Sequence, residues 1–324
     1  MNELCWRLGI GVPILCAPTG SIAGPELAAA VADSGGLGAM GLTWTDPATA
    51  AAWVRQVKAA TSAPFQVNFA LAFPPNALEA VLDAGAPVIT FSWGDPAPYV
   101  AAVRRAGAKL GIQVTCVSGV RRALEHNPDF LICQGIEAGG HVQSHASLGD
   151  LLPEIVVEAG EVPVAAAGGI AGASGIARTF ELGAQGAVLG TRFVATQESR
   201  AHPEFKNALI AATGLDTVLT TCFDIGWPQA PHRVLRNSTF DTWEAQGCPP
   251  SGLRPGEGDV VARTSAGVEI LRYEDTGAQA GMTGDIAAMC LYAGTGVGDV
   301  QDLPSAGDLV RRLWSEAKLL IQPR

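Results

Sequence analysis

Two stretches decide the fold: VPVAAAGGIAGASG at 162–175 and GAQGAVLGTRF at 183–193. Each contains a short apolar run that is typical of a buried strand, followed by a turn with glycine. An Ala-rich segment at 173–182 lies between the two runs, and its apolar spacing predicts a helix. A strand, a helix and a second strand in this order indicate a parallel sheet.

The same alternation recurs toward the N-terminus. We predict eight strands, at 13–18, 36–40, 65–71, 87–93, 109–115, 130–136, 162–167 and 186–191. Helices are predicted between them, at 25–34, 46–60, 97–107, 119–126, 149–159 and 173–182. Eight parallel strands with intervening helices predict an α/β protein with a (β/α)8 TIM barrel. Functional residues of such barrels follow the strands, at their C-terminal ends.

The amino-acid composition changes after the eighth predicted strand. We predict a barrel domain at 1–215 and, at 216–282, an inserted lid or small subdomain rich in Pro, Gly and Trp. The segment 283–324 returns to apolar helical spacing, in TGDIAAMCLYAG and in AGDLVRRLWSEAKLL. We expect it to form C-terminal helices that pack on the barrel.

Composition excludes several classes of protein. Of the 324 residues 48% are apolar and 16% are charged, which predicts a compact globular protein. The net charge of −10 disfavours nucleic acid and anionic membranes as partners. The 7 cysteines form no C-x-x-C pair, so we predict neither a disulfide framework nor a metal site. With no signal peptide or membrane span predicted, we expect a cytoplasmic protein.

The glycines of the two deciding stretches suit a phosphate group. Backbone N–H groups of Gly168, Gly169, Gly190 and Thr191 can approach phosphate oxygens closely, and a following helix N-terminus favours an anion. Barrels of this type commonly bind phosphate after strands seven and eight. The alternative is that these glycines only make tight turns. A dinucleotide site at GLGAMG, 36–41, is rejected because its glycines lie within a predicted strand.

A histidine follows the sixth predicted strand, in CQGIEAGGHVQSHASL at 133–148. Two glycines precede His141, so the backbone can pass close to a bound ring while the imidazole faces the barrel mouth. An imidazole there can accept a proton near neutral pH. We therefore predict that His141 is the catalytic residue.

Together these residues resemble the nitronate monooxygenase family, formerly called 2-nitropropane dioxygenases, which also includes flavin-dependent enoyl-ACP reductases and NADH:quinone reductases. The resemblance begins at PILCAPTGSIAG (13–24), continues through FQVNFAL and LGTRF, and ends at LYAGTGVG (291–298). It includes FDIGWPQAPHRVLRNS within the predicted insertion. The combination of QGIEAGGH, AAGGIA and GTRF is specific.

The resemblance implies noncovalent FMN, with its phosphate on the Gly168–Gly169 and Gly190–Thr191 loops. It also implies that His141 is the catalytic base. Further residues match flavin contacts of the family: Ala17, Pro18, Thr19, Asn68, Gln113, Gln134 and the backbone of Gly139. Two features depart from the family pattern. Thr19 stands where many relatives have Met, and VQSH follows His141 where better-known members have a shorter sequence.

The implied activity is the oxidative denitrification of alkyl nitronates or nitroalkanes by O2, which yields a carbonyl compound and nitrite. One alternative is an NAD(P)H-dependent flavin reductase that acts on a quinone or an enoyl thioester. Alternatives from other classes are a flavin-free barrel that binds a phosphorylated metabolite, and an interaction protein with a degenerate site. A homodimer is possible because apolar C-terminal helices can pack on a second copy.

Overall fold

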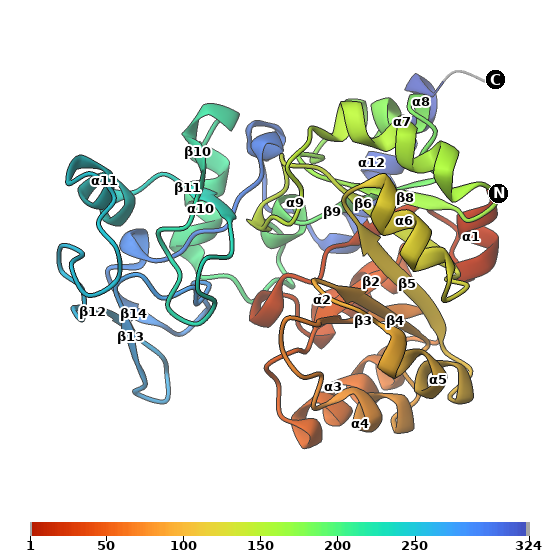
Figure 1. Ribbon diagram of the computed structural model, residues 1–324, viewed down its shortest axis with the longest axis horizontal. Helices are drawn as coiled ribbons and strands as arrows, with labels where there is room; N and C mark the ends of the chain where they lie inside the picture. The colour runs from red at the N-terminus through yellow and green to blue at the C-terminus, as the bar shows by residue number, and fades with distance from the viewer. Residues whose placement is uncertain (1, 322–324) are drawn as a thin grey trace.

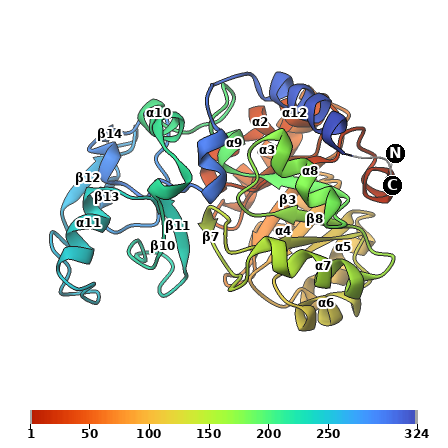
Figure 2. The same cartoon turned by 90° about the horizontal axis from the view of Figure 1, so that it is seen from above.

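Eight parallel strands form the larger of two lobes in the computed structural model, which describes residues 2–321 (Figures 1 and 2). They lie in the order β1-β9-β8-β6-β5-β4-β3-β2, and a bridge between Leu15 and Leu37 brings β1 back to β2. The (β/α)8 prediction and all eight strands are thus confirmed. Their bounds are β1 Ile14–Cys16, β2 Gly38–Gly41, β3 Phe65–Ala70, β4 Val88–Ser92, β5 Lys109–Val114, β6 Phe130–Gln134, β8 Val164–Ala167 and β9 Gly186–Leu189.

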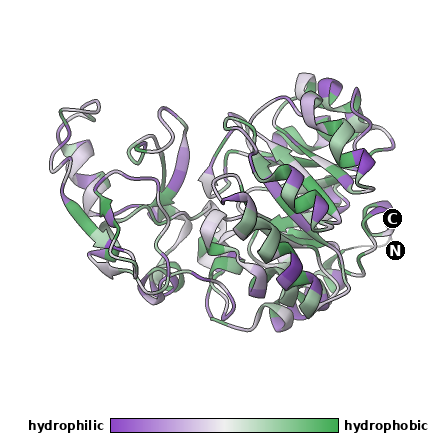
Figure 3. Ribbon diagram, turned by 90° about the horizontal axis from the view of Figure 1, so that it is seen from below, coloured by the Kyte–Doolittle hydropathy of each residue, from purple (hydrophilic) through white to green (hydrophobic). Residues whose placement is uncertain are grey.

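Helices surround these strands and bury their apolar faces against them (Figure 3). The six predicted helices are confirmed, and the shorter α4 was missed. Local sequence explains where several begin: Pro25 occupies the first turn of α2, and the Asp46 side chain caps α3 by accepting from the backbone N–H of Thr49. The bounds are α2 Pro25–Asp33, α3 Pro47–Ala60, α4 Leu78–Asp83, α5 Ala97–Arg105, α6 Val117–Leu124, α7 Leu148–Ala159 and α8 Ala173–Glu181.

A short helix that we did not predict, α1 (Glu3–Leu8), covers the N-terminal end of the barrel. Leu4 and Leu8 of this helix pack with Leu15 and Phe130 of the strands. Asn2 caps it by accepting from the backbone N–H of Cys5. The floor of the barrel is therefore apolar and closed, which leaves the opposite end for a ligand.

The smaller lobe follows β9 in the sequence. After the short helix α9 (Thr191–Val194), whose Phe193 packs in the barrel core, its elements are α10 Pro203–Ala211, β10 Thr217–Thr220, β11 His232–Leu235, α11 Ser238–Ala245, β12 Val260–Arg263, β13 Glu269–Leu271 and β14 Thr283–Gly284. One of its sheets has the order β13-β12-β14, and the other has the order β10-β11-β7. The strand β7 (Gly140–His141) comes from the barrel loop after β6, so this loop is hydrogen-bonded into the smaller lobe.

The C-terminal segment is helical only in part. The predicted helix at 306–320 is confirmed as α12 (Ala306–Leu320), which packs on α2 and α8 (Figure 2). The helix expected in TGDIAAMCLYAG is wrong, because Asp285 caps a single 3-10 turn and the chain then extends to bridge Val234 through Tyr292. Apolar residues of this stretch pack with α10 and β13 in the smaller lobe. The division at residues 215 and 282 stays a prediction.

None of the helices within residues 2–321 is both long and apolar enough to cross a bilayer.

Candidate functional site

A cavity of about 570 Å³ lies at the C-terminal ends of the barrel strands. The smaller lobe contributes part of its wall, including Trp227, Asp275 and Tyr292. All twelve residues that the sequence pointed to line this one cavity: Ala17, Pro18, Thr19, Asn68, Gln113, Gln134, Gly139, His141, Gly168, Gly169, Gly190 and Thr191. The size is in the range of cofactor and small-molecule sites.

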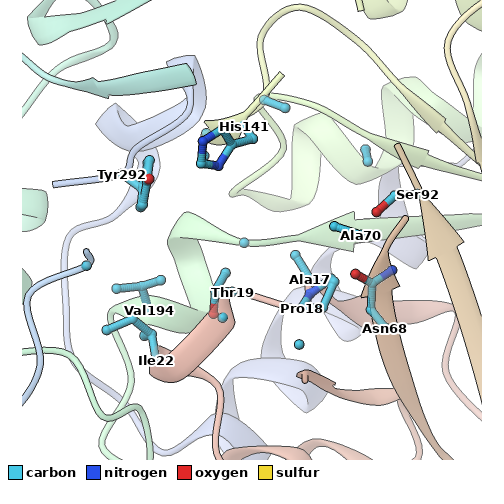
Figure 4. Close-up of a pocket in the computed structure, with 18 of the residues that line it drawn as sticks. Ala17, Pro18, Thr19, Ile22, Asn68, Ala70, Ser92, His141, Val194 and Tyr292 are labelled. Carbon is cyan, nitrogen blue, oxygen red and sulfur yellow. The ribbon is translucent and has the colours of Figure 1, made fainter. Parts of the chain in front are cut away.

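Figure 4 shows how the labelled side chains face one another. His141 and Tyr292 lie on one side of the cavity, and Ala17, Pro18 and Asn68 lie on the other. The first pair comes from β7 and the smaller lobe, whereas the second set follows β1 or belongs to β3. A ligand in the cavity would therefore be enclosed between the barrel mouth and the smaller lobe.

One end of the cavity carries unpaired backbone donors. Within residues 2–321, the N–H groups of Gly168, Gly169, Gly190 and Thr191 donate to no protein acceptor. Gly169 has a φ of 64°, and a Cβ there would lie 2.6 Å from Oγ1 of Thr295. Unpaired N–H groups are costly unless a ligand or water accepts from them, and an anion suits them best. These donors form a cradle that fits a phosphate group.

His141 is held in place by its backbone. Nε2 of Gln134 donates to the carbonyl of His141 at 3.2 Å, and Oε1 of Gln134 accepts from the N–H of Gln143 at 2.8 Å. On the other side, His141 pairs with His232 of β11. Gln134 thus holds the loop after β6 through the backbone of His141 and Gln143. Together with the pairing to β11, these hydrogen bonds fix the position of the imidazole.

The imidazole of His141 lies among other rings, those of Trp93, Trp227, His232 and Tyr292. It stacks on Trp227 with ring centroids 4.3 Å apart, and Nε2 is buried without a hydrogen-bond partner in the described part of the chain. Burial, and to a smaller extent the nearby His232, lowers the pKa of His141 to about 3. The ring is therefore neutral near pH 7 and is a weak base in this arrangement.

Two side-chain amides face the cavity from the strands. Nδ2 of Asn68 donates to the carbonyl and to Oγ1 of Thr90, each at 3.2 Å. Nε2 of Gln113 donates to Oε1 of Gln143 at 3.3 Å. Among the described residues, none donates a hydrogen bond to the amide oxygens of Asn68 and Gln113. Each side chain therefore offers an oriented acceptor to a ligand.

Sequence reasoning missed Asp275 and Tyr292, both from the smaller lobe. The hydroxyl of Tyr292 donates to the backbone carbonyl of Asp275 at 2.8 Å. Burial raises the pKa of Asp275 to about 6, and burial also raises the pKa of Tyr292 well above its ordinary value. No local motif marks either residue, although Tyr292 lies within the LYAGTGVG block. Only the packing of the smaller lobe over the barrel brings them to the cavity.

No group of three or more His, Cys, Asp or Glu side chains within residues 2–321 is placed to hold a metal ion.

Comparison with known proteins shows which family this chain resembles. The sequence profile of the family described as "Nitronate monooxygenase" matches residues 2–77 and 69–316. A nitronate monooxygenase of Pseudomonas aeruginosa is 28% identical, over 96% of this chain and 97% of its own. A (3aS,4S,5R,7aS)-5-hydroxy-7a-methyl-1-oxo-octahydro-1H-indene-4-carboxyl-CoA dehydrogenase of Mycobacterium tuberculosis is 33% identical, over 74% of this chain and 67% of its own.

A solved structure is similar over nearly the whole chain. FabK from Thermotoga maritima has a TM-score of 0.85 and 27% sequence identity, and the match covers 99% of this chain and 97% of that one. The matched family region spans both the barrel strands and every cavity residue named above. The chain belongs to the nitronate monooxygenase family, and with it to the oxidoreductases that act on small-molecule substrates.

Proposed function

We propose that this protein binds FMN and oxidises alkyl nitronates with O2 to a carbonyl compound and nitrite. In the balanced net reaction, two nitronate anions and one O2 give two carbonyl compounds and two nitrite ions. The observation that carries the proposal is one cavity with an anion cradle at one end and a buried, unpaired imidazole on its wall. The family resemblance supports FMN as the group for that cradle.

The residues present fit this cofactor. The unpaired N–H groups of Gly168, Gly169, Gly190 and Thr191 would hold its phosphate, and the amides of Asn68, Gln113 and Gln134 would contact its ring system. Bound FMN would supply the electron acceptor that no side chain of the cavity provides. The protein contributes binding, orientation and the exclusion of water.

The low pKa of His141 favours a preformed nitronate over a neutral nitroalkane as the substrate. A base with a pKa of about 3 has little driving force to remove a proton from carbon. A nitronate has already lost that proton and needs only to be oriented. His141 lines the cavity, and we place its imidazole beside the nitro group as a polar ring next to the apolar face of Trp227.

The experiment that tests the proposal is an anaerobic absorbance measurement on protein loaded with FMN. The protein is mixed in parallel with ethylnitronate and with NADH or NADPH. Bleaching of the flavin absorbance by the nitronate, followed by nitrite formation when O2 is admitted, is the expected result. Rapid bleaching by the nicotinamide alone would instead assign the protein as a reductase.

A reductase is the second candidate, and one observation favours it. A relative with 33% identity is named as a dehydrogenase of a carboxyl-CoA compound, so the same scaffold is associated with thioester substrates. The absorbance experiment separates the two candidates directly. A protein that cannot be loaded with FMN at all would contradict both.

We also propose a cytoplasmic protein that forms a homodimer. All seven cysteines are free in the structure, which suits a reducing compartment. Sedimentation analysis of the FMN-loaded protein tests the dimer.

A further inference from the structure

Four aromatic rings gather at one side of the cavity, and we call them the aromatic wall: Trp44, Phe73, Trp93 and Trp227. Trp227 lies at the centre, with ring centroids 4.8 Å from Trp93, 5.0 Å from Phe73 and 6.0 Å from Trp44. The ring of Trp44 also lies 5.3 Å from that of Phe73. Trp44, Trp93 and Trp227 line the cavity itself, so the wall faces any ligand there.

The wall joins the two lobes. Trp44, Phe73 and Trp93 follow three neighbouring barrel strands, β2, β3 and β4, whereas Trp227 precedes β11 in the smaller lobe. Trp227 also stacks on His141. The aromatic surface is therefore continuous with the imidazole that we place next to the reacting group.

Two features of the aromatic wall are energetically unfavourable, and a hydrophobic core alone would not require them. The side chain of Trp44 is 59% exposed although it is one of the largest apolar groups. Trp93 has a φ of 62°, in the left-handed region that a residue with a Cβ rarely adopts. Backbone strain of this kind persists at binding sites because the surrounding structure enforces it. Both indoles are thereby presented to the cavity instead of being buried behind it.

The charge of the cavity disfavours a substrate with an acidic tail. Of the described residues that line it, Asp275 is the only Asp, Glu, Lys or Arg. A carboxylate or phosphate on the substrate tail would find no cationic side chain and would lie in a cavity that already contains a carboxyl group. An aromatic tail would instead bury its surface against indole rings in edge or offset contacts.

We propose that the aromatic wall binds an aryl or similarly bulky apolar group of the substrate, so the preferred nitronates carry such a group and no acidic tail. This inference rests on the proposed function, because it names the substrate class for that same site. The wall determines specificity, and the imidazole beside it meets the nitro group.

The test compares three preformed nitronates: those of 2-phenyl-1-nitroethane, nitroethane and 3-nitropropionate. We expect kcat/KM for the phenyl compound to exceed the other two by about tenfold or more. In Trp44→Ala the ratio of phenyl compound to nitroethane falls by about fivefold or more, because one ring of the wall is removed. Trp44→Phe keeps a ring and restores most of the ratio. Trp6→Ala, which removes a 71% exposed indole on α1 away from the cavity, leaves the ratio unchanged.

A second measurement separates this inference from the proposed function. Calorimetric binding of 2-phenylethanol, which has the aryl group and no nitro group, is compared between the wild type and Trp44→Ala, both loaded with FMN. If no nitronate is oxidised but 2-phenylethanol binds and Trp44→Ala weakens it, the denitrification proposal fails and the aromatic site stands. If nitronates are oxidised without a preference for the phenyl compound, or with a preference that Trp44→Ala does not change, the inference is overturned. Absence of 2-phenylethanol binding to the wild type overturns it as well.

Discussion

At the scale of single residues, the site depends on how completely its titratable groups are buried. Burial, together with the nearby His232, lowers the pKa of His141, whereas burial raises the pKa of Asp275. Both groups favour their neutral forms. The cavity therefore presents a nearly uncharged surface around the reacting group at mildly acidic pH.

The first prediction concerns His141→Ala. We expect the variant to retain FMN and to lose no more in kcat/KM with neutral nitroethane than with ethylnitronate, because an imidazole with a pKa of about 3 is too weak a base to remove the proton from carbon. With ethylnitronate we expect a loss of about tenfold, since only orientation is affected. Steady-state nitrite release with both substrates measures this. His145→Ala, on the same loop and exposed, is the matched control. A loss with nitroethane much larger than the loss with ethylnitronate would contradict the orienting role and assign His141 as a proton acceptor.

The second prediction concerns pH and Asp275. Its pKa is about 6 in the folded protein and near 3.8 when unfolded, so between these values the native state binds more protons than the unfolded state. Stability therefore falls as pH rises through this window and stays lower above it. Thermal melts at pH 4.5 and pH 8 should show Asp275→Asn gaining stability at pH 8 relative to the wild type. Asp83→Asn, which removes an exposed carboxylate at the end of α4, should show no such gain.

At the scale of elements, the loop between β8 and α8 sets the anion cradle. The segment from Gly168 to Gly172 contains two consecutive positive φ angles, at Gly168 and Gly169, and both residues line the cavity with N–H groups that donate to no acceptor among the described residues. Thr295, in the smaller lobe, packs where a side chain on Gly169 would have to go. A Cβ at that point would therefore force Thr295 or the loop to move.

The third prediction follows from this loop. Gly169→Ala should raise the Kd for FMN by about tenfold (about 1.4 kcal/mol), because the new Cβ clashes with Thr295 and the left-handed backbone becomes strained. Riboflavin, which lacks the phosphate, should lose less affinity. Fluorescence titration of both flavins measures the difference. Gly107→Ala is a matched control, with a φ of 71° and no atom within 4 Å of the new Cβ. An equal loss for both flavins would exclude the cradle as the phosphate site.

At the scale of the whole molecule, the sequence predicted the barrel far better than the smaller lobe. Barrel strands are short apolar runs at regular spacing, and each is followed by its own helix, so local pattern and global fold agree. In TGDIAAMCLYAG the apolar residues are spaced as in a helix, yet the Asp285 cap and the bridge to Val234 make the chain extended. Tertiary contacts override local spacing in that lobe.

The residues of the candidate site show the same difference between the barrel and the smaller lobe. The cavity residues that were predicted belong to the barrel strands or directly follow them, where the fold class itself predicts function. Three cavity residues that were not predicted lie in segments whose position over the barrel depends on packing between the two lobes: Trp227, Asp275 and Tyr292. The spacing of residues in the sequence does not indicate that packing.

One consequence follows from β7. Because this strand is paired with β11, the backbone that carries His141 is hydrogen-bonded to the smaller lobe as well as to Gln134 of the barrel. A motion that separated the two lobes would therefore have to break either the pairing of β7 with β11 or the hydrogen bonds of Gln134. The position of the imidazole in the cavity therefore depends on both lobes at once.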